Sequence, residues 1–113
     1  MAEIRVIAAG GQHFTDRDRV TRTLQRLGAL HLIGFEPEQI VLVHGGSTGA
    51  DTLAAEEAVK LGWRTEPHPG KDMVRSGAAY AVVFPGGQGT ARCRRLALNA
   101  RIPVIDVKES SRG

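Results

Sequence analysis

Short apolar runs alternate along the chain with amphipathic or glycine-rich stretches. The run at 40–43, Ile-Val-Leu-Val, is continuous and β-branched, which is typical of a central parallel strand covered on both faces. The run at 4–9 has a similar character, and the others are shorter and bounded by glycine or proline. We therefore predict five strands, at residues 4–9, 40–43, 64–68, 79–84 and 103–107.

A helical pattern follows the first run. Apolar residues recur there at i, i+4 and i+7, on one helical face: Val20, Leu24 and Leu27. Thr15 is the predicted N-cap, with Asp18 as its capping-box partner. Gly28 marks the predicted end of this helix, and residues 30–38 then form a connector.

Two further helices are predicted from the same kind of pattern. One follows the glycines after residue 44 and runs to Leu61, where Gly62 is a natural stop. The other spans residues 91–99. A shorter stretch, residues 71–76, is predicted to make one or two helical turns.

The order of these elements predicts an α/β fold. Strand and helix alternate, which is typical of a single three-layer domain with a mostly parallel five-stranded sheet. Right-handed crossovers make 3-2-1-4-5 the simplest strand order. We assign residues 1–108 to this domain and residues 109–113 to a polar tail. The ligand crevice of such a sheet lies beyond the carboxyl ends of the strands, between the first and fourth strands.

Paired glycines follow three of the predicted strands. They are Gly10-Gly11, Gly45-Gly46 and the pair Gly86-Gly87 within residues 85–90. Where a strand ends at glycines and the chain continues as a helix, the first helical N–H groups lack partners and the helix dipole favours an anion. Glycines also let a phosphate approach the backbone without meeting a Cβ. All three loops border the expected crevice, so we predict one composite anion pocket.

Composition narrows the choice of partners. The chain has 113 residues, a net charge of +3 and few aromatic residues, so the arginines lack neighbours on which bases could stack. We therefore expect a small anion rather than nucleic acid, although a weak polyanion surface stays open. The apolar runs are far shorter than about 18 residues, no secretion signal is visible and Cys93 is alone. These features predict a cytoplasmic protein outside the membrane.

Three segments carry a family resemblance: residues 10–16 (GGQHFTD), 44–54 (HGGSTGADTLA) and 84–90 (FPGGQGT). With these motifs in order, nearly the whole chain resembles the YspA-like (cpYpsA-related) branch of the SLOG superfamily. The resemblance implies a Rossmann-like domain and a nucleotide or nucleotide-derived ligand. More distant relatives include the DNA-processing protein DprA and the lonely-guy phosphoribohydrolases, which cleave the bond between base and ribose phosphate.

The chain departs from this family where chemistry would be expected. Gln12-His13 replaces an Arg-Asp pair, and an Arg-Asn stretch ahead of Met73 is missing. The lonely-guy motif continues into a pair of glutamates, one of them catalytic, whereas here 91–93 reads Ala-Arg-Cys. No Asp or Glu occurs between Asp72 and Asp106. The resemblance therefore supports binding and weakens hydrolysis.

The candidate ligand-binding residues all belong to the three loops. They are Gly10, Gly11, Gln12, His13, Phe14, Gly45, Gly46, Ser47, Thr48, Gly49, Asp51, Pro85, Gly86, Gly87, Gln88, Gly89 and Thr90. Structural alternatives stay open: Thr90 could simply cap a helix, and Asp51 could close a capping box with Thr48 instead of binding ribose hydroxyls. Gln12 and His13 either read a base edge or belong to a solvated loop.

Other polar residues are interpreted as structural. His44 is predicted to be a hydrogen-bonded histidine near the core, and Cys93 an inert core thiol. Arg92 flanks the third loop within reach of a ligand. We assign no catalytic residue, metal ligand or cofactor, because no motif has metal-ligand spacing.

These predictions combine into a small binding module. It would sense or sequester a nucleotide or nucleotide-derived anion, with the phosphate over residues 85–90, the sugar near 45–51 and the base toward 10–14. The alternative is a phosphoribohydrolase or nucleosidase-like enzyme that cleaves an N-glycosidic bond, with Asp51 or a residue from a partner subunit as its carboxylate. A third possibility is a nucleic-acid accessory role as in DprA. Relatives often pair through helices flanking the sheet, so the resemblance also implies a homodimer or larger homo-oligomer.

Overall fold

The computed structural model describes residues 3–46, 48–68, 74 and 77–108. Each predicted strand is present, with ends that differ from the prediction by at most one residue. The elements are β1 (Ile4–Ala9), α1 (Arg17–His31), the 3-10 helix η1 (Pro37–Gln39), β2 (Ile40–His44), α2 (Ala50–Lys60), β3 (Arg64–Pro67), β4 (Tyr80–Val83), α4 (Gln88–Asn99) and β5 (Val104–Asp106).

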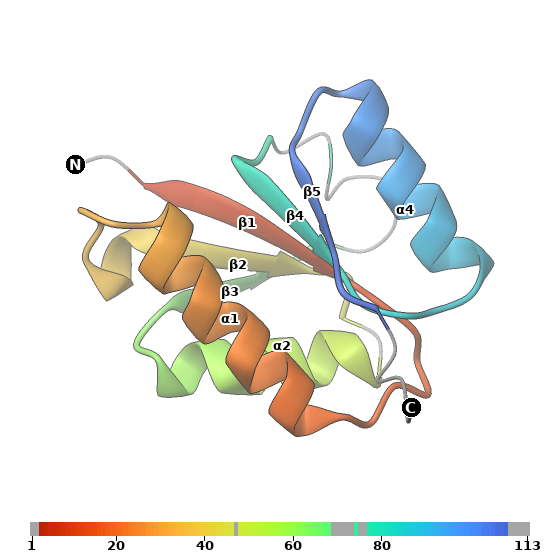
Figure 1. Cartoon of the computed structure of the whole chain (residues 1–113), viewed down its shortest axis with the longest axis horizontal. Coiled ribbons are helices and arrows are strands. Elements are labelled where there is room, and N and C mark those ends of the chain that lie inside the picture. Colours follow the sequence, from red (N-terminus) through yellow and green to blue (C-terminus); the bar gives the residue numbers. More distant parts are fainter. Residues whose placement is uncertain (1–2, 47, 69–73, 75–76, 109–113) are drawn as a thin grey trace.

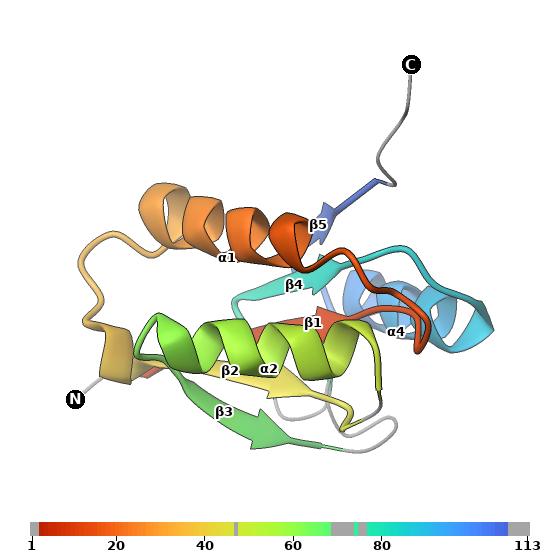
Figure 2. The ribbon, with the colours of Figure 1, turned by 90° about the horizontal axis from the view of Figure 1, so that it is seen from below.

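The five strands form one parallel sheet in the order β3-β2-β1-β4-β5, as predicted. α1 and α2 pack together on one face of the sheet, and α4 lies on the other (Figures 1 and 2). This arrangement confirms the Rossmann-like three-layer fold. The chain moves outward from β1 in both directions, so the carboxyl ends of β1, β2 and β4 lie side by side at one edge.

The core divides into two clusters because side chains on a strand alternate between faces. Val6 of β1 packs with Leu24 of α1 on one face. Ile7, the next residue, packs with Ala97 of α4 on the other. Full burial of an aliphatic side chain of this size contributes about 1.5–3 kcal/mol to stability. β1 is thus anchored from both sides, and the loop that follows it starts from a fixed point.

α1 begins and ends later than predicted. Asp16, not Thr15, is the N-cap, and its side chain accepts a hydrogen bond from Arg19 N at 3.1 Å. The helix continues through Gly28 to His31. Gly28 is half-buried, and a Cβ there would lie 3.6 Å from Trp63 in ordinary contact, so the position does not require glycine and the helix runs through it. Packing on the sheet overrides the intrinsic cost of about 1 kcal/mol.

α4 begins three residues before the predicted start. Gly87 is its N-cap, and Gln88 to Thr90 form its first turn rather than a loop before it. Thr90 therefore lies within the helix and is not its cap. The helical turns predicted at 71–76 lie outside the described residues except for Val74, as does the predicted tail at 109–113.

A buried carboxylate joins α1 to α2. Glu57 is 5% exposed, and it accepts hydrogen bonds from Lys60 at 2.9 Å, Thr21 at 2.8 Å and Arg17 at 2.7 Å. These bonds, that of Lys60 foremost, lower the pKa of Glu57 to about 2. Glu56 beside it is exposed and pairs with the same arginine at 2.7 Å. In the described part of the chain, no helix combines the length and hydrophobicity that a membrane crossing requires.

Candidate functional site

A cavity of about 1080 Å³ opens at the carboxyl edge of the sheet, where the three glycine loops meet. Most of the predicted binding residues line it: Gly10, Gly11, Gln12, His13, Phe14, Gly45, Asp51, Pro85, Gly86, Gly87, Gln88, Gly89 and Thr90. Gly46, Thr48 and Gly49 are not among the lining residues, and Ser47 lies outside the described residues. The first and third loops therefore form most of the wall.

Gly11 connects the three loops through its backbone. Its N–H donates to the carbonyl of Pro85 at 2.9 Å, and its carbonyl accepts from Ala50 N at 3.1 Å. The same carbonyl accepts from Phe14 N at 3.2 Å. A single residue, Gly11, thereby contacts both the turn before α4 and the first turn of α2. The cavity wall is continuous because these three segments are hydrogen-bonded to one another.

Four glycines allow this close approach, and three of them have no room for a side chain. A Cβ on Gly49 would lie 2.3 Å from the Gly11 carbonyl oxygen, and one on Gly10 would lie 2.4 Å from Ala50 Cβ. A Cβ on Gly86 would meet Gly11 N at 2.6 Å. A Cβ on Gly11 would lie 3.0 Å from Gly86 Cα, a tight contact that requires the neighbouring loop to shift slightly. Real Cβ atoms essentially never lie under 3.0 Å from another atom, so Gly10, Gly49 and Gly86 are required for the close contact between the loops.

The remaining glycines of the loops face open space. A Cβ on Gly46, Gly87 or Gly89 would meet no atom within 4 Å. Gly87 and Gly89 lie at the start of α4 and line the cavity. The first N–H groups of a helix have no acceptor within the helix, and its dipole is positive at this end. The start of α4 is thus the part of the cavity best suited to an anion.

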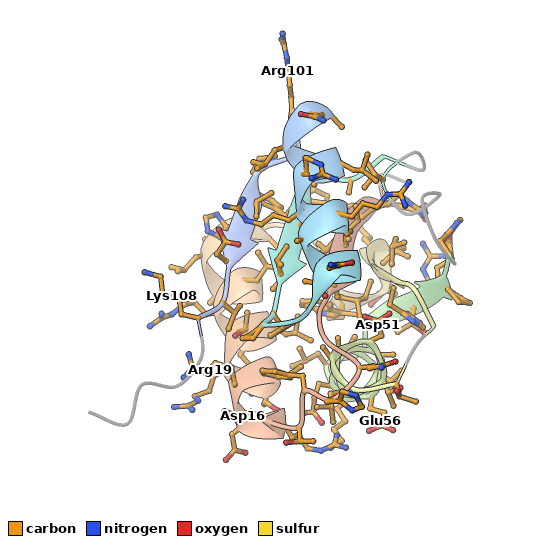
Figure 3. All side chains as sticks on the ribbon, turned by 90° about the vertical axis from the view of Figure 1, so that its right-hand side faces the viewer. Asp16, Arg19, Asp51, Glu56, Arg101 and Lys108 are labelled. Carbon is orange, nitrogen blue, oxygen red and sulfur yellow. The ribbon has the colours of Figure 1, made fainter. Side chains whose placement is uncertain are left out.

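Asp51 lies in the first turn of α2 and is 4% exposed (Figure 3). Its Oδ2 accepts a hydrogen bond from Gly45 N at 2.9 Å, so it holds the loop after β2 against the helix that follows. The alternative of a capping box with Thr48 requires Thr48 as the N-cap, but Gly49 is the N-cap of α2 and no side chain caps it. Asp51 instead lines the cavity as a buried carboxylate.

α4 contributes three cavity residues beyond the loops; the sequence had placed Arg92 within reach of a ligand but had left Cys93 and Leu96 outside the site. Arg92, Cys93 and Leu96 line the cavity below the first turn of the helix. Their spacing from Gly89, at i+3, i+4 and i+7, is the helical pattern that would have found them. Cys93 is half-buried; burial raises the pKa of its thiol, and the negative charge of Asp51 adds to this. A raised pKa disfavours the thiolate, and Cys93 faces the cavity instead of being the fully buried core thiol that the sequence predicted.

The two candidate histidines near the loops differ in their surroundings. His44 is half-buried, and its Nδ1 accepts a hydrogen bond from Gly46 N at 3.1 Å, the structural role predicted for it. His13 is exposed at the cavity rim, with its Nε2 3.4 Å from Gln12 Nε2. Among the described residues, no group of three metal-binding side chains is gathered closely enough for a metal ion.

Comparison with known proteins identifies the family. The profile of the YspA, cpYpsA-related SLOG family matches residues 4–70, more than half of the chain. The chain belongs to this family. This SLOG protein is 34% identical over 123 residues to the Gene 61 protein of Mycobacterium phage D29. The alignment covers 90% of this chain and 94% of the phage protein. The family resemblance drawn from the three motifs is confirmed.

A solved structure supports the fold of this SLOG protein. It is similar to the Moco carrier protein from Chlamydomonas reinhardtii with a TM-score of 0.66 and 21% sequence identity. The similarity covers 93% of this chain and 76% of that chain. At this identity the comparison establishes a shared fold.

Proposed function

We propose that this protein binds a nucleotide or nucleotide-derived anionic small molecule, which it senses or sequesters, with the phosphate at the start of α4. The carrying observation is the open space at Gly87 and Gly89 in the first turn of a cavity-lining helix. A phosphate there can approach the backbone N–H groups of residues 88–90 without displacing any side chain.

The charges of the cavity support a single anionic group. Arg92 is the only lysine or arginine among the described residues that line it, and it lies one turn below the start of α4. Two carboxylates, Asp16 and Asp51, also line the cavity and would repel additional negative charge. We infer that the ligand carries one phosphate rather than a polyphosphate chain.

A binding role also agrees with the chemistry of the lining residues. No glutamate lines the cavity in the described part of the chain, and the Cys93 thiol is held in its neutral form. Asp16 is engaged as the N-cap of α1. We also retain the predictions of a homo-oligomer and of a cytoplasmic location. Native mass spectrometry of the purified protein would test the oligomer and would detect any nucleotide that co-purifies.

A nucleosidase or phosphoribohydrolase is the second candidate, and Asp51 is the observation in its favour. It is a buried carboxylate on the cavity wall, where a glycosidic bond could lie against it. Incubation of the protein with nucleoside 5′-monophosphates, followed by chromatography for free base, separates the two functions. Turnover that is abolished in Asp51→Ala would establish the enzyme and overturn the purely binding role.

The phosphate position is tested by adding a side chain at Gly87. Ribose 5-phosphate and adenosine 5′-monophosphate should raise the melting temperature of the wild-type protein, because a ligand that binds only the folded state stabilises it. Gly87→Val should melt at a similar temperature without ligand but lose this increase. Ala91→Val is the matched control, since Ala91 is in the same helical turn but does not line the cavity. An unchanged ligand effect in Gly87→Val would contradict the proposal.

A further inference from the structure

Positive charge gathers in the part of the chain that forms β4, α4 and β5. Residues 77–108 contain four arginines and one lysine but a single carboxylate, Asp106. That carboxylate is engaged with Arg94 through two hydrogen bonds of 2.8 Å. Figure 3 shows Arg101 at the end of α4, away from the carboxylates labelled near α1 and α2. The remaining cations of this segment therefore have little negative charge to offset them.

The arginines of α4 follow one exposed face of the helix. Gln88, Arg92, Arg95 and Asn99 recur at i, i+4, i+7 and i+11, and all four residues are exposed. Arg101 is exposed just beyond the end of the helix. Within the described residues, no carboxylate forms an ion pair with Arg92, Arg95 or Arg101. We call these three residues the α4 arginines.

The other outer helix of the sheet does not offer an equivalent surface. Arg22 and Arg26 of α1 also lack an ion pair in the part of the chain that the structure describes. However, Asp16 caps α1 and Asp18 lies in its first turn, so acidic side chains share this helix with the arginines. α4 contains no aspartate or glutamate at all. Attraction of a polyanion is thus expected at α4 first.

We propose that the α4 arginines bind the phosphate backbone of a nucleic-acid duplex, a second binding function that is separate from the cavity. A duplex carries one negative charge per about 1.7 Å of its axis, so a row of cations can contact several phosphates at once. Contacts to phosphates alone carry no sequence information, and the binding is therefore independent of base sequence. The sequence left a weak polyanion surface open, and this proposal assigns it to α4.

The side chains of α4 favour a duplex over other polyanions. Proteins hold single strands largely by stacking bases on aromatic side chains, and α4 has no aromatic residue. Helices that lie on a membrane insert a broad apolar face into it. The apolar face of α4 is instead used within the protein, where Ala97 and Cys93 pack against the sheet.

Fluorescence anisotropy of a labelled DNA duplex of about 20 base pairs, titrated with the full chain, tests the proposal. We expect a dissociation constant of about 10⁻⁴ M or tighter at about 50 mM salt. Three phosphate contacts predict a slope of about −2.7 when the logarithm of the affinity is plotted against the logarithm of the salt concentration. The affinity should thus fall about 40-fold between about 50 and 200 mM salt.

Arg95→Gln is the test variant, and Arg64→Gln is its matched control. Each removes one positive charge, but Arg64 lies on β3 at the opposite edge of the sheet and pairs with Glu3. Arg95→Gln should make the salt slope shallower by about 0.9, the share of one phosphate contact. Arg64→Gln should leave the slope unchanged. Gly87→Val, which fills the proposed phosphate position in the cavity, should also leave duplex binding unchanged.

Several results would overturn the proposal. One is the absence of duplex binding by the wild-type protein at about 50 mM salt, whether or not the variants fold. Equal changes of slope in Arg95→Gln and Arg64→Gln would show an effect of net charge alone. Tighter binding to polyglutamate or to phosphatidylserine vesicles than to the duplex would assign the surface to another kind of partner. Loss of duplex binding in Gly87→Val would place the nucleic acid in the cavity rather than on α4.

Discussion

Glycines in the same three loops have opposite surroundings, although the sequence presents them as equivalent pairs. Gly49 and Gly86 would each place a Cβ within 2.6 Å of the Gly11 backbone, whereas Gly46 and Gly87 would place one in open space. The first kind allows the loops to touch one another. The second kind leaves room for something that is not part of the chain. A glycine-rich motif therefore combines two requirements, and only the second concerns a ligand.

The largest expected loss of stability is at Gly49, and comparison with Gly46 separates the effect of crowding around a Cβ from the effect of backbone conformation. Gly49 and Gly46 have nearly the same positive φ, 77° and 79°, but only Gly49 lacks space for a Cβ. We expect Gly49→Ala to cost at least about 3 kcal/mol, because strain adds to a collision with the backbone of residues 11 and 12. Gly46→Ala should cost only about 1–2 kcal/mol, the penalty of a positive φ. Urea denaturation of both variants measures the difference.

Equal losses of unfolding free energy in Gly49→Ala and Gly46→Ala would show that only the positive φ matters. The loops would then be able to move apart to accept a Cβ. The comparison between the two kinds of glycine would then lose its physical basis. A circular dichroism spectrum confirms that any residual folded state of Gly49→Ala keeps its helices, so that the free energies of unfolding refer to the same fold.

A smaller effect is expected where charge, rather than close backbone contact, joins two elements. Glu57 accepts hydrogen bonds from three side chains between α1 and α2. Glu57→Gln should lower the free energy of unfolding by about 1–2 kcal/mol at neutral pH, the cost of weakening hydrogen bonds to a buried charged group. Glu56→Gln, which affects an exposed pair with the same Arg17, should cost less than about 1 kcal/mol.

The pH dependence identifies this contribution. The pKa of Glu57 falls from its usual 4.5 to about 2 in the folded protein, so the unfolded chain binds the proton first as pH decreases. The stabilisation is complete above about pH 4.5 and is lost as the pH falls towards 2. Glu57→Gln should therefore show a shallower decline over this window than the wild type. The pKa of Glu66 is also about 2, so a residual decline remains in the variant. Identical slopes would contradict the role assigned to Glu57.

The sequence was sufficient to predict the fold and the edge of the sheet where the cavity lies. Both follow from strand–helix alternation and from the handedness of crossovers, which local patterns reveal. It was insufficient to separate Gly49 from Gly46, because that difference depends on how closely residues 11 and 12 approach a loop far away in sequence. Asp51 posed the same difficulty: its partner, Gly45 N, becomes apparent only when the loop is folded against α2.

The smallest expected effect has the opposite sign. Gly89 lies in the first turn of α4, a Cβ there meets nothing within 4 Å, and its φ is not positive. Gly89→Ala should raise the free energy of unfolding of the ligand-free protein by about 0.5 kcal/mol, because alanine loses less backbone entropy in a helix than glycine. A small increase in the urea midpoint, beside the large decrease in Gly49→Ala, would show that the fold tolerates a side chain at Gly89 and that glycine there serves another purpose. If Gly89→Ala is instead destabilised, the start of α4 needs its glycine for folding, and the open space there is no longer an argument for a ligand.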